Sequence, residues 1–344
     1  MKALVAGIAL VTALTGAGLL WSYRIIQAPL SLPDSPVVLE VKSGQSLKSL
    51  LLELEADGFL QRPHVLALWA RWQGLDRQIQ AGEYELHPGL TGASFLNLLA
   101  SGAVLSYRIT LPEGITLSDA LARLHKDGRL AREIQHVDDP RLLDLVAPHE
   151  SAEGWFLPET YQYVTGDTDL DILRRAHKLM VQALNQAWTT RAADVPLNDP
   201  YEALILASIV ERETSVAEER PQIAGVFSRR LERGMRLQTD PTVIYGLGAA
   251  FDGNLKRRHL RDAANRWNTY QIKGLPPSPI ALPGVSALQA AVNPEAGDTL
   301  YFVARGDGYH VFSASLEEHN ANVRRYQLSR KAEYRSTPSG KGIK

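Results

Sequence analysis

The amino-acid sequence predicts an α+β protein made of an N-terminal transmembrane helix, a small α+β module and a larger mixed α+β domain. Three observations support this fold class. The chain begins with a long apolar segment that carries no charge, and a strand–turn–helix pattern occurs twice in its first half. Segments of helical periodicity then alternate with short strand-like segments toward the C-terminus.

The composition is that of a globular protein without a strongly charged partner. Of the 344 residues, 45% are hydrophobic and 22% are charged, and the length suggests two or three domains. The 37 basic and 38 acidic residues give a formal net charge of −1, so no nucleic-acid partner is expected. The absence of cysteine excludes disulfides and thiol nucleophiles. No H-E-x-x-H or G-x-S-x-G pattern occurs, so the sequence predicts neither a metal site nor a cofactor.

Residues 1–24 are predicted to form a membrane anchor. Residues 3–21 have no charge and are long enough to cross a hydrocarbon core of about 30 Å as a helix. A cleaved signal peptide is the alternative, but no A-x-A cleavage site follows, and the apolar run exceeds a usual signal core. Lys2 on the short N-terminal side predicts that the N-terminus stays in the cytoplasm and the rest lies outside it.

Residues 25–37 are rich in proline and are predicted to be an extended linker. The repeated pattern follows, in which residues 39–47 resemble residues 109–117 at an offset of 70 (114 − 44). The matched positions are Gly44 with Gly114, Ser46 with Thr116, and Gly58 with Gly128. Each copy predicts a strand, a turn at glycine, a helix capped by Ser or Thr, and an end at the second glycine.

The first copy lies in a predicted module of residues 38–105, and the second in a small βα module or connector of residues 106–150. In the first module, a second helix at residues 64–72, a strand at residues 81–88 and a helix at residues 91–100 follow. This order resembles a LysM-like sugar-binding module, although LysM-like modules lack the last helix. The alternative is an α+β spacer without sugar contact.

Residues 151–327 are predicted to form the mixed α+β domain, and residues 328–344 a flexible tail. Within the domain, residues 301–312 predict a β-hairpin in the core sheet. Residues 153–161 are rich in aromatic side chains and are predicted mainly as a packed corner of the core. Their alternative role is the wall of a sugar-binding cleft, because flat aromatic faces stack on pyranose rings.

A buried helix is predicted to run from Pro200 to about Thr214, with Asp199 as its N-cap. Residues 203–210 are almost wholly apolar, and the helix then ends in Glu211-Arg-Glu213. At about 100° per residue, Glu213 continues the apolar stripe and Glu211 points about 160° away from it. The two carboxylates therefore cannot serve one cleft from the same face of an intact helix.

Glu213 is thus a candidate for a lone catalytic carboxyl. Burial at the end of an apolar stripe would raise its pKa and keep it protonated near neutral pH, so that it could donate a proton to a leaving oxygen. The alternative is a solvated or paired surface group, which is the usual state of a glutamate in a last helical turn.

Four segments carry a resemblance to a known family: Ser208-Ile-Val-Glu-Arg-Glu-Thr214, Arg236-Leu-Gln-Thr-Asp-Pro-Thr-Val-Ile-Tyr-Gly246, Asn268-Thr-Tyr270 and Gly274-Leu-Pro-Pro277. With the anchor and the preceding modules, they resemble the MltG/YceG family of endolytic peptidoglycan lytic transglycosylases. The resemblance covers nearly the whole chain. It implies cleavage of the bond between N-acetylmuramic acid and N-acetylglucosamine without water, leaving 1,6-anhydro ends and terminating nascent glycan strands.

The resemblance also implies the site and the surroundings of the protein. Glu213 would be the catalytic acid and base. The implied substrate-binding residues are Gln238, Asp240, Tyr245, Asn268 and Tyr270. From the residues alone, Asp240 could instead cap a turn at Thr242, and Tyr245 could be part of the core. The implied location is the inner membrane, crossed once, with the catalytic domain in the periplasm and with peptidoglycan and cell-wall synthases as partners.

Two other functions remain open at this stage. A hydrolytic muramidase would use Glu213 with a second carboxylate, and the candidates for that group are Glu211, Asp240 and Glu159. A non-catalytic scaffold that binds peptidoglycan would depend on the LysM-like module alone.

Overall fold

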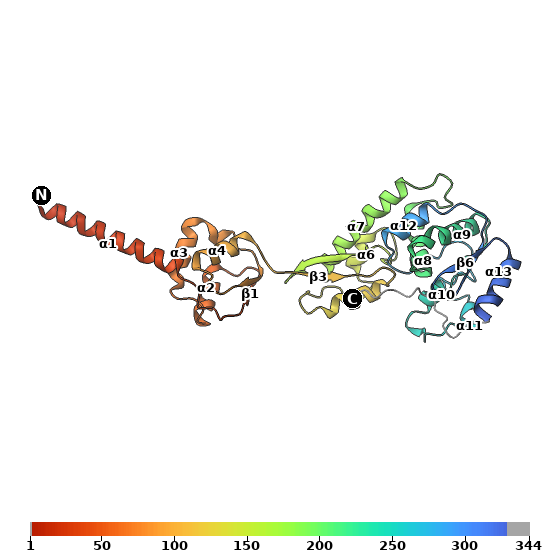
Figure 1. Ribbon diagram of the computed structural model, residues 1–344, viewed down its shortest axis with the longest axis horizontal. Coiled ribbons are helices and arrows are strands. Elements are labelled where there is room, and N and C mark those ends of the chain that lie inside the picture. Colours follow the sequence, from red (N-terminus) through yellow and green to blue (C-terminus); the bar gives the residue numbers. More distant parts are fainter. Residues whose placement is uncertain (1, 329–344) are drawn as a thin grey trace. The chain divides into compact units, whose positions relative to one another are not determined.

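The computed structural model describes residues 2–328, and the predicted tail from residue 329 onward lies outside the described residues. The chain divides into two compact units (Figure 1). Unit 1 comprises Met1–Arg108 and Gln162–Asp167, and unit 2 comprises Ile109–Tyr161 and Thr168–Lys344. Helices and short strands are mixed in both units, as the predicted α+β class requires.

Helix α1 (Lys2–Gln27) is the predicted membrane helix. Its Leu4–Gln27 segment is long and apolar enough to cross a membrane, with a mean hydropathy of 2.0, and it leaves its apolar side chains exposed. The helix continues three residues beyond the predicted boundary at residue 24. Ile26 and Leu30 are buried, and the Leu30 amide donates to the Leu90 carbonyl (2.8 Å). The start of the predicted extended linker is therefore packed, because burying these apolar side chains is favourable.

Unit 1 has the order of elements that the sequence predicts for its first module. The elements are β1 (Val37–Val41), α2 (Leu47–Ala56), α3 (Pro63–Gln73), β2 (Gly82–Leu86) and α4 (Gly92–Ser101). Strands β1 and β2 are antiparallel, with Val37 opposite Leu86 and Val41 opposite Gly82. Leucines of the three helices pack around Tyr84 and Phe95, which are fully buried.

The internal repeat is visible as a shared turn and a shared helix cap. Gly44 and Gly114 adopt nearly the same left-handed backbone (φ 76° and 77°), which glycine tolerates without steric cost. Ser46 caps α2, and Thr116 caps α5 (Leu117–Lys126) in a capping box with Asp119. In the second copy, strand β3 (Ser106–Thr110) pairs with β4 (Thr160–Val164), which lies far away in the sequence.

Unit 2 is built around helix α8 (Pro200–Glu213), whose residues from Ala203 to Glu211 are all buried. The other elements are α6 (Pro140–Val146), α7 (Asp169–Thr189), α9 (Arg220–Glu232), α10 (Asp240–Leu247), α11 (Arg257–Leu260), α12 (Val285–Val292), β5 (Tyr301–Ala304), β6 (His310–Ser313) and α13 (Leu316–Val323). Helices α7, α9 and α12 pack against α8. An α8 that is apolar on all sides requires such a cover.

The predicted β-hairpin forms as strands β5 and β6, but the prediction that it belongs to a core sheet is wrong. Within residues 2–328 every sheet has two strands, and β5 pairs only with β6. The helices around α8 bury the apolar side chains that a larger sheet would otherwise cover. The hairpin instead contributes to the wall of a cavity, described below.

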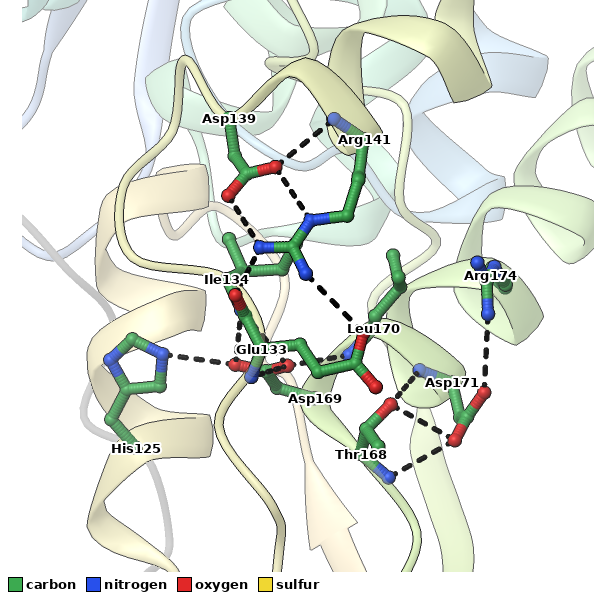
Figure 2. A network of polar contacts seen from close by, with 10 residues as sticks. All are labelled: His125, Glu133, Ile134, Asp139, Arg141, Thr168, Asp169, Leu170, Asp171 and Arg174. Carbon is green, nitrogen blue, oxygen red and sulfur yellow. Dashed lines mark hydrogen bonds and ion pairs between the residues drawn. The ribbon is translucent and has the colours of Figure 1, made fainter.

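A polar network fastens the second copy of the repeat to the rest of unit 2 (Figure 2). Asp169, the first residue of α7, is fully buried. Its carboxylate accepts hydrogen bonds from the amides of Glu133 (2.9 Å), Ile134 and Leu170, and lies 3.1 Å from the His125 ring of α5. Because a buried carboxylate requires such donors, the network fixes α5 and the segment after it against the start of α7.

Candidate active site

Glu213, the last residue of α8, lies in the wall of a cavity of about 640 Å³. The polar side chains around it come from α9, α10, β6 and two loops. The polar and ionisable lining residues include Arg230, Gln238, Thr239, Asp240, Tyr270 and His310. The hydroxyl of Thr239 donates a hydrogen bond to the Glu213 carboxylate. Among residues 2–328, no three His, Asp or Glu side chains gather closely enough to hold a metal ion.

Threonines hold the loop before α10 in place beneath Glu213. The amide of Thr239 donates to the Thr269 hydroxyl (3.0 Å), and the hydroxyls of Thr242 and Thr269 lie 2.9 Å apart. The amide of Gln238 donates to the Thr269 carbonyl (3.2 Å). Gln238 has a left-handed backbone (φ 53°), which costs about 1–2 kcal/mol in a non-glycine residue and is maintained by these bonds.

Burial raises the pKa of Glu213 above the ordinary value of a glutamate. The hydrogen bond from Thr239 and the positive charges of His310 and Arg230 act in the opposite direction, and the negative charge of Asp240 adds to the rise. The net rise means that Glu213 keeps its proton to a higher pH than a solvated carboxyl does. This is the property expected of a general acid.

His310 is held rigidly in the same cavity by Glu219. One oxygen of Glu219 lies 2.8 Å from Nδ1 of the ring, and the other accepts a hydrogen bond from the His310 amide (2.7 Å). Thr214, next to the catalytic candidate, donates to Glu219 as well (3.2 Å). Two bonds from one buried carboxylate fix both the backbone and the ring of His310, and the ring lines the cavity.

Glu211 lies in a different environment, as the helical geometry predicts. Its carboxylate accepts from Arg220 (2.7 Å) and from the amide of Gly284 (3.0 Å), which is the N-cap of α12. Arg220 also donates to Glu113 (3.1 Å). A Cβ on Gly284 would overlap the Glu113 carboxylate at 1.8 Å, so a larger residue there would displace this half-exposed side chain. Glu211 therefore joins α8, α9 and α12 and is absent from the lining of the Glu213 cavity.

The structure brings three of the predicted substrate-binding residues to the Glu213 cavity. Gln238, Asp240 and Tyr270 all line it, and the hydroxyl of Tyr270 donates to Asp240 (2.7 Å). Thr242 donates to the Thr239 carbonyl (2.7 Å). Of the candidates for a second carboxylate, Asp240 is the one that lines this cavity, whereas Glu159 is exposed elsewhere.

Asn268 and Tyr245 are placed differently. Asn268 is fully buried, and its amide donates to the carbonyls of His259 (3.1 Å) and Asp262 (2.8 Å), so it organises a loop. Tyr245 is half-buried and lines a second cavity of about 470 Å³. Its hydroxyl donates to the buried carboxyl of Glu153 (3.3 Å).

Burial also raises the pKa of Glu153, to about 7, although the amide of Leu117 (2.9 Å) and the hydroxyl of Tyr245 donate to it. A protonated carboxyl is thus close to half-populated at neutral pH in this second cavity. Desolvation dominates because the side chain is only 5% exposed and no cation offsets it.

Sequence reasoning missed Thr239, Arg230 and His310 as members of the site. Thr239 lies inside the quoted segment around Gln238 and Asp240, and that position was the available signal. Arg230 belongs to α9 and donates to the carbonyls of Leu300 (2.7 Å) and Leu237 (2.6 Å). Arg230 lies within an ordinary amphipathic helix pattern, which does not indicate a role in the site. The residues next to His310 form no motif that would indicate one either.

Comparisons with known proteins agree on one family. The model of the YceG-like family matches residues 39–325. A Bacillus subtilis (strain 168) protein named endolytic murein transglycosylase is 28% identical over 335 residues, which cover 92% of this chain and 91% of that protein. A Streptococcus pneumoniae (strain D39) protein of the same name is 26% identical, and the match covers 94% of this chain and 65% of that longer protein. A solved structure of a YceG-like protein from Listeria monocytogenes superposes with a TM-score of 0.52 at 26% identity, covering 84% of this chain and 99% of that chain.

The two glutamates at the end of α8 are expected to respond in opposite ways to the same substitution. Glu211→Gln weakens a buried ion pair and should lower the free energy of unfolding by about 3 kcal/mol, because Arg220 loses its nearest charge partner. Burial raises the pKa of both glutamates, but Glu213 has no cation at ion-pair distance among the described residues, so Glu213→Gln should leave stability unchanged or raise it. Urea unfolding of the full chain in detergent measures both. Equal losses in the two variants would contradict these assignments.

Glu153→Gln should remove a pH dependence of stability. In the native state the pKa of Glu153 is about 7, against an ordinary 4.5, so the folded chain binds the extra proton. Stability is therefore highest below about pH 4.5 and declines through pH 7, by about 3 kcal/mol in total for this group. The unfolding free energy of Glu153→Gln relative to that of the unchanged chain should rise by about 2.5 kcal/mol from pH 5 to pH 8. Glu159→Gln, at an exposed position, is the control and should show no such trend.

Proposed function

Because the chain belongs to the YceG-like family, we propose that it is an endolytic peptidoglycan lytic transglycosylase in which Glu213 is the single acid and base. The observation that carries the proposal is the position of Glu213. It ends a buried helix, lines a cavity of about 640 Å³ and has a pKa raised by burial. The other glutamate of the same helix end is bound to Arg220.

The proposed reaction has two proton transfers through one carboxyl group. Protonated Glu213 donates its proton to the glycosidic oxygen between N-acetylmuramic acid and N-acetylglucosamine, and the bond from C1 to that oxygen breaks. The Glu213 carboxylate then accepts the proton of the C6 hydroxyl of the muramoyl ring, whose oxygen bonds to C1. The products are a 1,6-anhydro end and a free sugar hydroxyl, and Glu213 is protonated again. Water takes no part, because a tethered hydroxyl has a far higher effective concentration.

The groups around Glu213 suit this reaction. The Thr239 hydroxyl can stabilise the carboxylate once the proton has left, because it already donates to that oxygen. Gln238 and the pair of Tyr270 and Asp240 offer an amide, a hydroxyl and a carboxylate to the sugar substituents on the cavity wall. The negative charge of Asp240 also stabilises the positive charge that develops at C1 of the sugar ring as the bond breaks.

A hydrolytic muramidase is the second candidate, and the position of Asp240 is what favours it. Asp240 lines the cavity with Glu213 and could serve as the second carboxylate that activates water. Its hydrogen bond from Tyr270 is compatible with either role. The identity of the new sugar end decides between the two reactions.

We propose that α1 anchors the enzyme in the inner membrane, with its N-terminus in the cytoplasm and unit 2 in the periplasm, where peptidoglycan lies. The length and apolarity of α1 and the basic residue before it support this placement. Partnership with cell-wall synthases stays a prediction from the family resemblance.

We also propose that residues 38–105 of unit 1 act as a LysM-like module that contacts glycan. The support is its β1–α2–α3–β2 order with the two strands antiparallel and adjacent. The helix α4 that follows is the departure already noted in the sequence.

Mass spectrometry of digested glycan strands tests the proposed function. The full chain should produce 1,6-anhydromuramoyl ends, and Glu213→Gln should reduce their formation at least about 1,000-fold, because no other group supplies the proton. Glu211→Gln, measured on the fraction that remains folded, should retain the reaction. Reducing ends in place of anhydro ends would reject the transglycosylase in favour of the muramidase.

His310→Gln should shift the pH dependence of cleavage. The positive charge of His310 lowers the pKa of Glu213, so its removal lets that pKa rise further. Because the protonated form of Glu213 is the active acid, the fall in kcat on the alkaline side should move to higher pH. His319→Gln is the matched control, since His319 lines the same cavity but is not among the groups that act most strongly on the pKa of Glu213. A shift of the same size in both variants would contradict the role of His310.

A further inference from the structure

The cavity that contains Glu153 is not used by the proposed reaction, yet its wall has a specific composition. Its aromatic lining residues are His149, Tyr201, Tyr245 and Trp267, and its charged ones are Asp138, Glu150, Glu153 and Arg266. They come from α8, α10 and three loops of unit 2. The volume of about 470 Å³ is within the range of pockets that hold small ligands.

The aromatic rings of this cavity are held in fixed orientations. Trp267 donates from its indole nitrogen to the Ser278 hydroxyl (3.0 Å) and meets Tyr245 edge to face, with ring centroids 5.4 Å apart. His149 stacks on Tyr201 at 4.1 Å. All four rings are only partly buried, so each keeps surface for a ligand. A rigid ring loses little entropy when it binds.

The polar groups of the cavity complement the rings. Glu153 is buried, and the amide of Leu117 and the hydroxyl of Tyr245 use only part of the acceptor capacity of its two oxygens. Arg266 is exposed and adds a donor. Flat apolar faces next to a fixed carboxyl and a donor match a pyranose ring, which has apolar C–H faces and a rim of hydroxyl and acetamido groups.

Two segments connect this cavity to the one that contains Glu213. Helix α10 contributes Asp240 to the Glu213 cavity and Tyr245 to the Glu153 cavity. These residues are five positions apart (245 − 240), which is about 8 Å along a helix. The loop after α11 contributes Tyr270 to the first cavity and Trp267 to the second. The same helix and the same loop therefore border both cavities, which places them within reach of one stretch of glycan.

We propose that the cavity formed by Glu153, Tyr245 and Trp267 is a second saccharide subsite, which binds an N-acetylated sugar ring of the same strand away from the bond that Glu213 cleaves. This inference rests on the proposed function. It explains how cleavage within a strand is favoured over cleavage at an end, because only a strand that continues past the scissile bond fills both cavities.

Binding of glycan oligosaccharides of defined length tests the subsite. The full chain with Glu213→Gln, in detergent, is titrated calorimetrically with peptide-free oligosaccharides of two and of eight sugars. Trp267→Ala in this background should reduce the ratio of long-ligand to short-ligand affinity about tenfold, equivalent to about 1.4 kcal/mol. Tyr245→Phe should reduce the same ratio less, because it removes only the hydroxyl bound to Glu153. Trp188→Ala, at the end of α7 and outside both cavities, should leave the ratio unchanged.

A kinetic measurement separates this inference from the proposed function. In the chain with Glu213 intact, Trp267→Ala should lower kcat/KM for long strands and leave kcat/KM nearly unchanged for strands too short to reach the second cavity. If the unchanged chain forms anhydro ends but the affinity ratio does not respond to Trp267 or Tyr245, the subsite is wrong and the proposed function stands. If the unchanged chain forms no anhydro ends, the proposed function itself fails. Equal weakening of short and long ligands by Trp267→Ala would also overturn the subsite.

Discussion

The burial of helix α8 is the constraint on which the rest of unit 2 depends. Its residues from Ala203 to Glu211 are all buried and Glu213 is half-buried, so Glu211 in particular requires a partner within the protein. Glu211 binds Arg220 and the amide that begins α12, and this contact joins three core helices at one point. Glu213 faces the other way and receives only a hydroxyl from Thr239. The Glu211 carboxylate is therefore paired with a cation in the core, whereas the Glu213 carboxyl remains able to exchange a proton.

The same constraint explains how the cavity around Glu213 is assembled. A carboxyl at the end of a buried helix needs neighbours that tolerate both its charged and its uncharged form. Hydroxyl groups tolerate both forms. The loop that carries Thr239 is also held by a hydrogen bond from the Thr239 amide to the Thr269 hydroxyl. The positive groups are fixed by separate contacts: Arg230 binds backbone carbonyls, and His310 is bound to Glu219. Their charge therefore acts on Glu213 through space without forming an ion pair that would hold it ionised.

Local sequence signals predicted most of the elements and the key separation of the two glutamates, because caps and helical periodicity are properties of neighbouring residues. Asp199 caps α8, and the helix ends at Glu213, within one residue of the predicted boundary. The missed features depend on contacts between distant segments: Glu219 meets His310 from 91 positions away. Asn268 and Tyr245 show that a motif shared with a family does not by itself predict where a residue's side chain lies. Both belong to family-like segments, yet Asn268 supports a loop from within and Tyr245 faces another cavity.

When the nucleophile is part of the substrate, the rate of the reaction depends strongly on how the protein binds and orients that substrate. Where water attacks, the protein can position it with a second carboxylate, but a C6 hydroxyl is positioned only if the whole ring is held. Binding free energy from sugar rings remote from the cleaved bond can supply that restraint, because it is available to distort and orient the ring at Glu213. In the proposed mechanism, α10 and the loop containing Trp267 and Tyr270, which border both cavities, would connect remote binding to the reacting ring. One acidic side chain would then suffice for the chemistry, because the rest of the site would fix the strand.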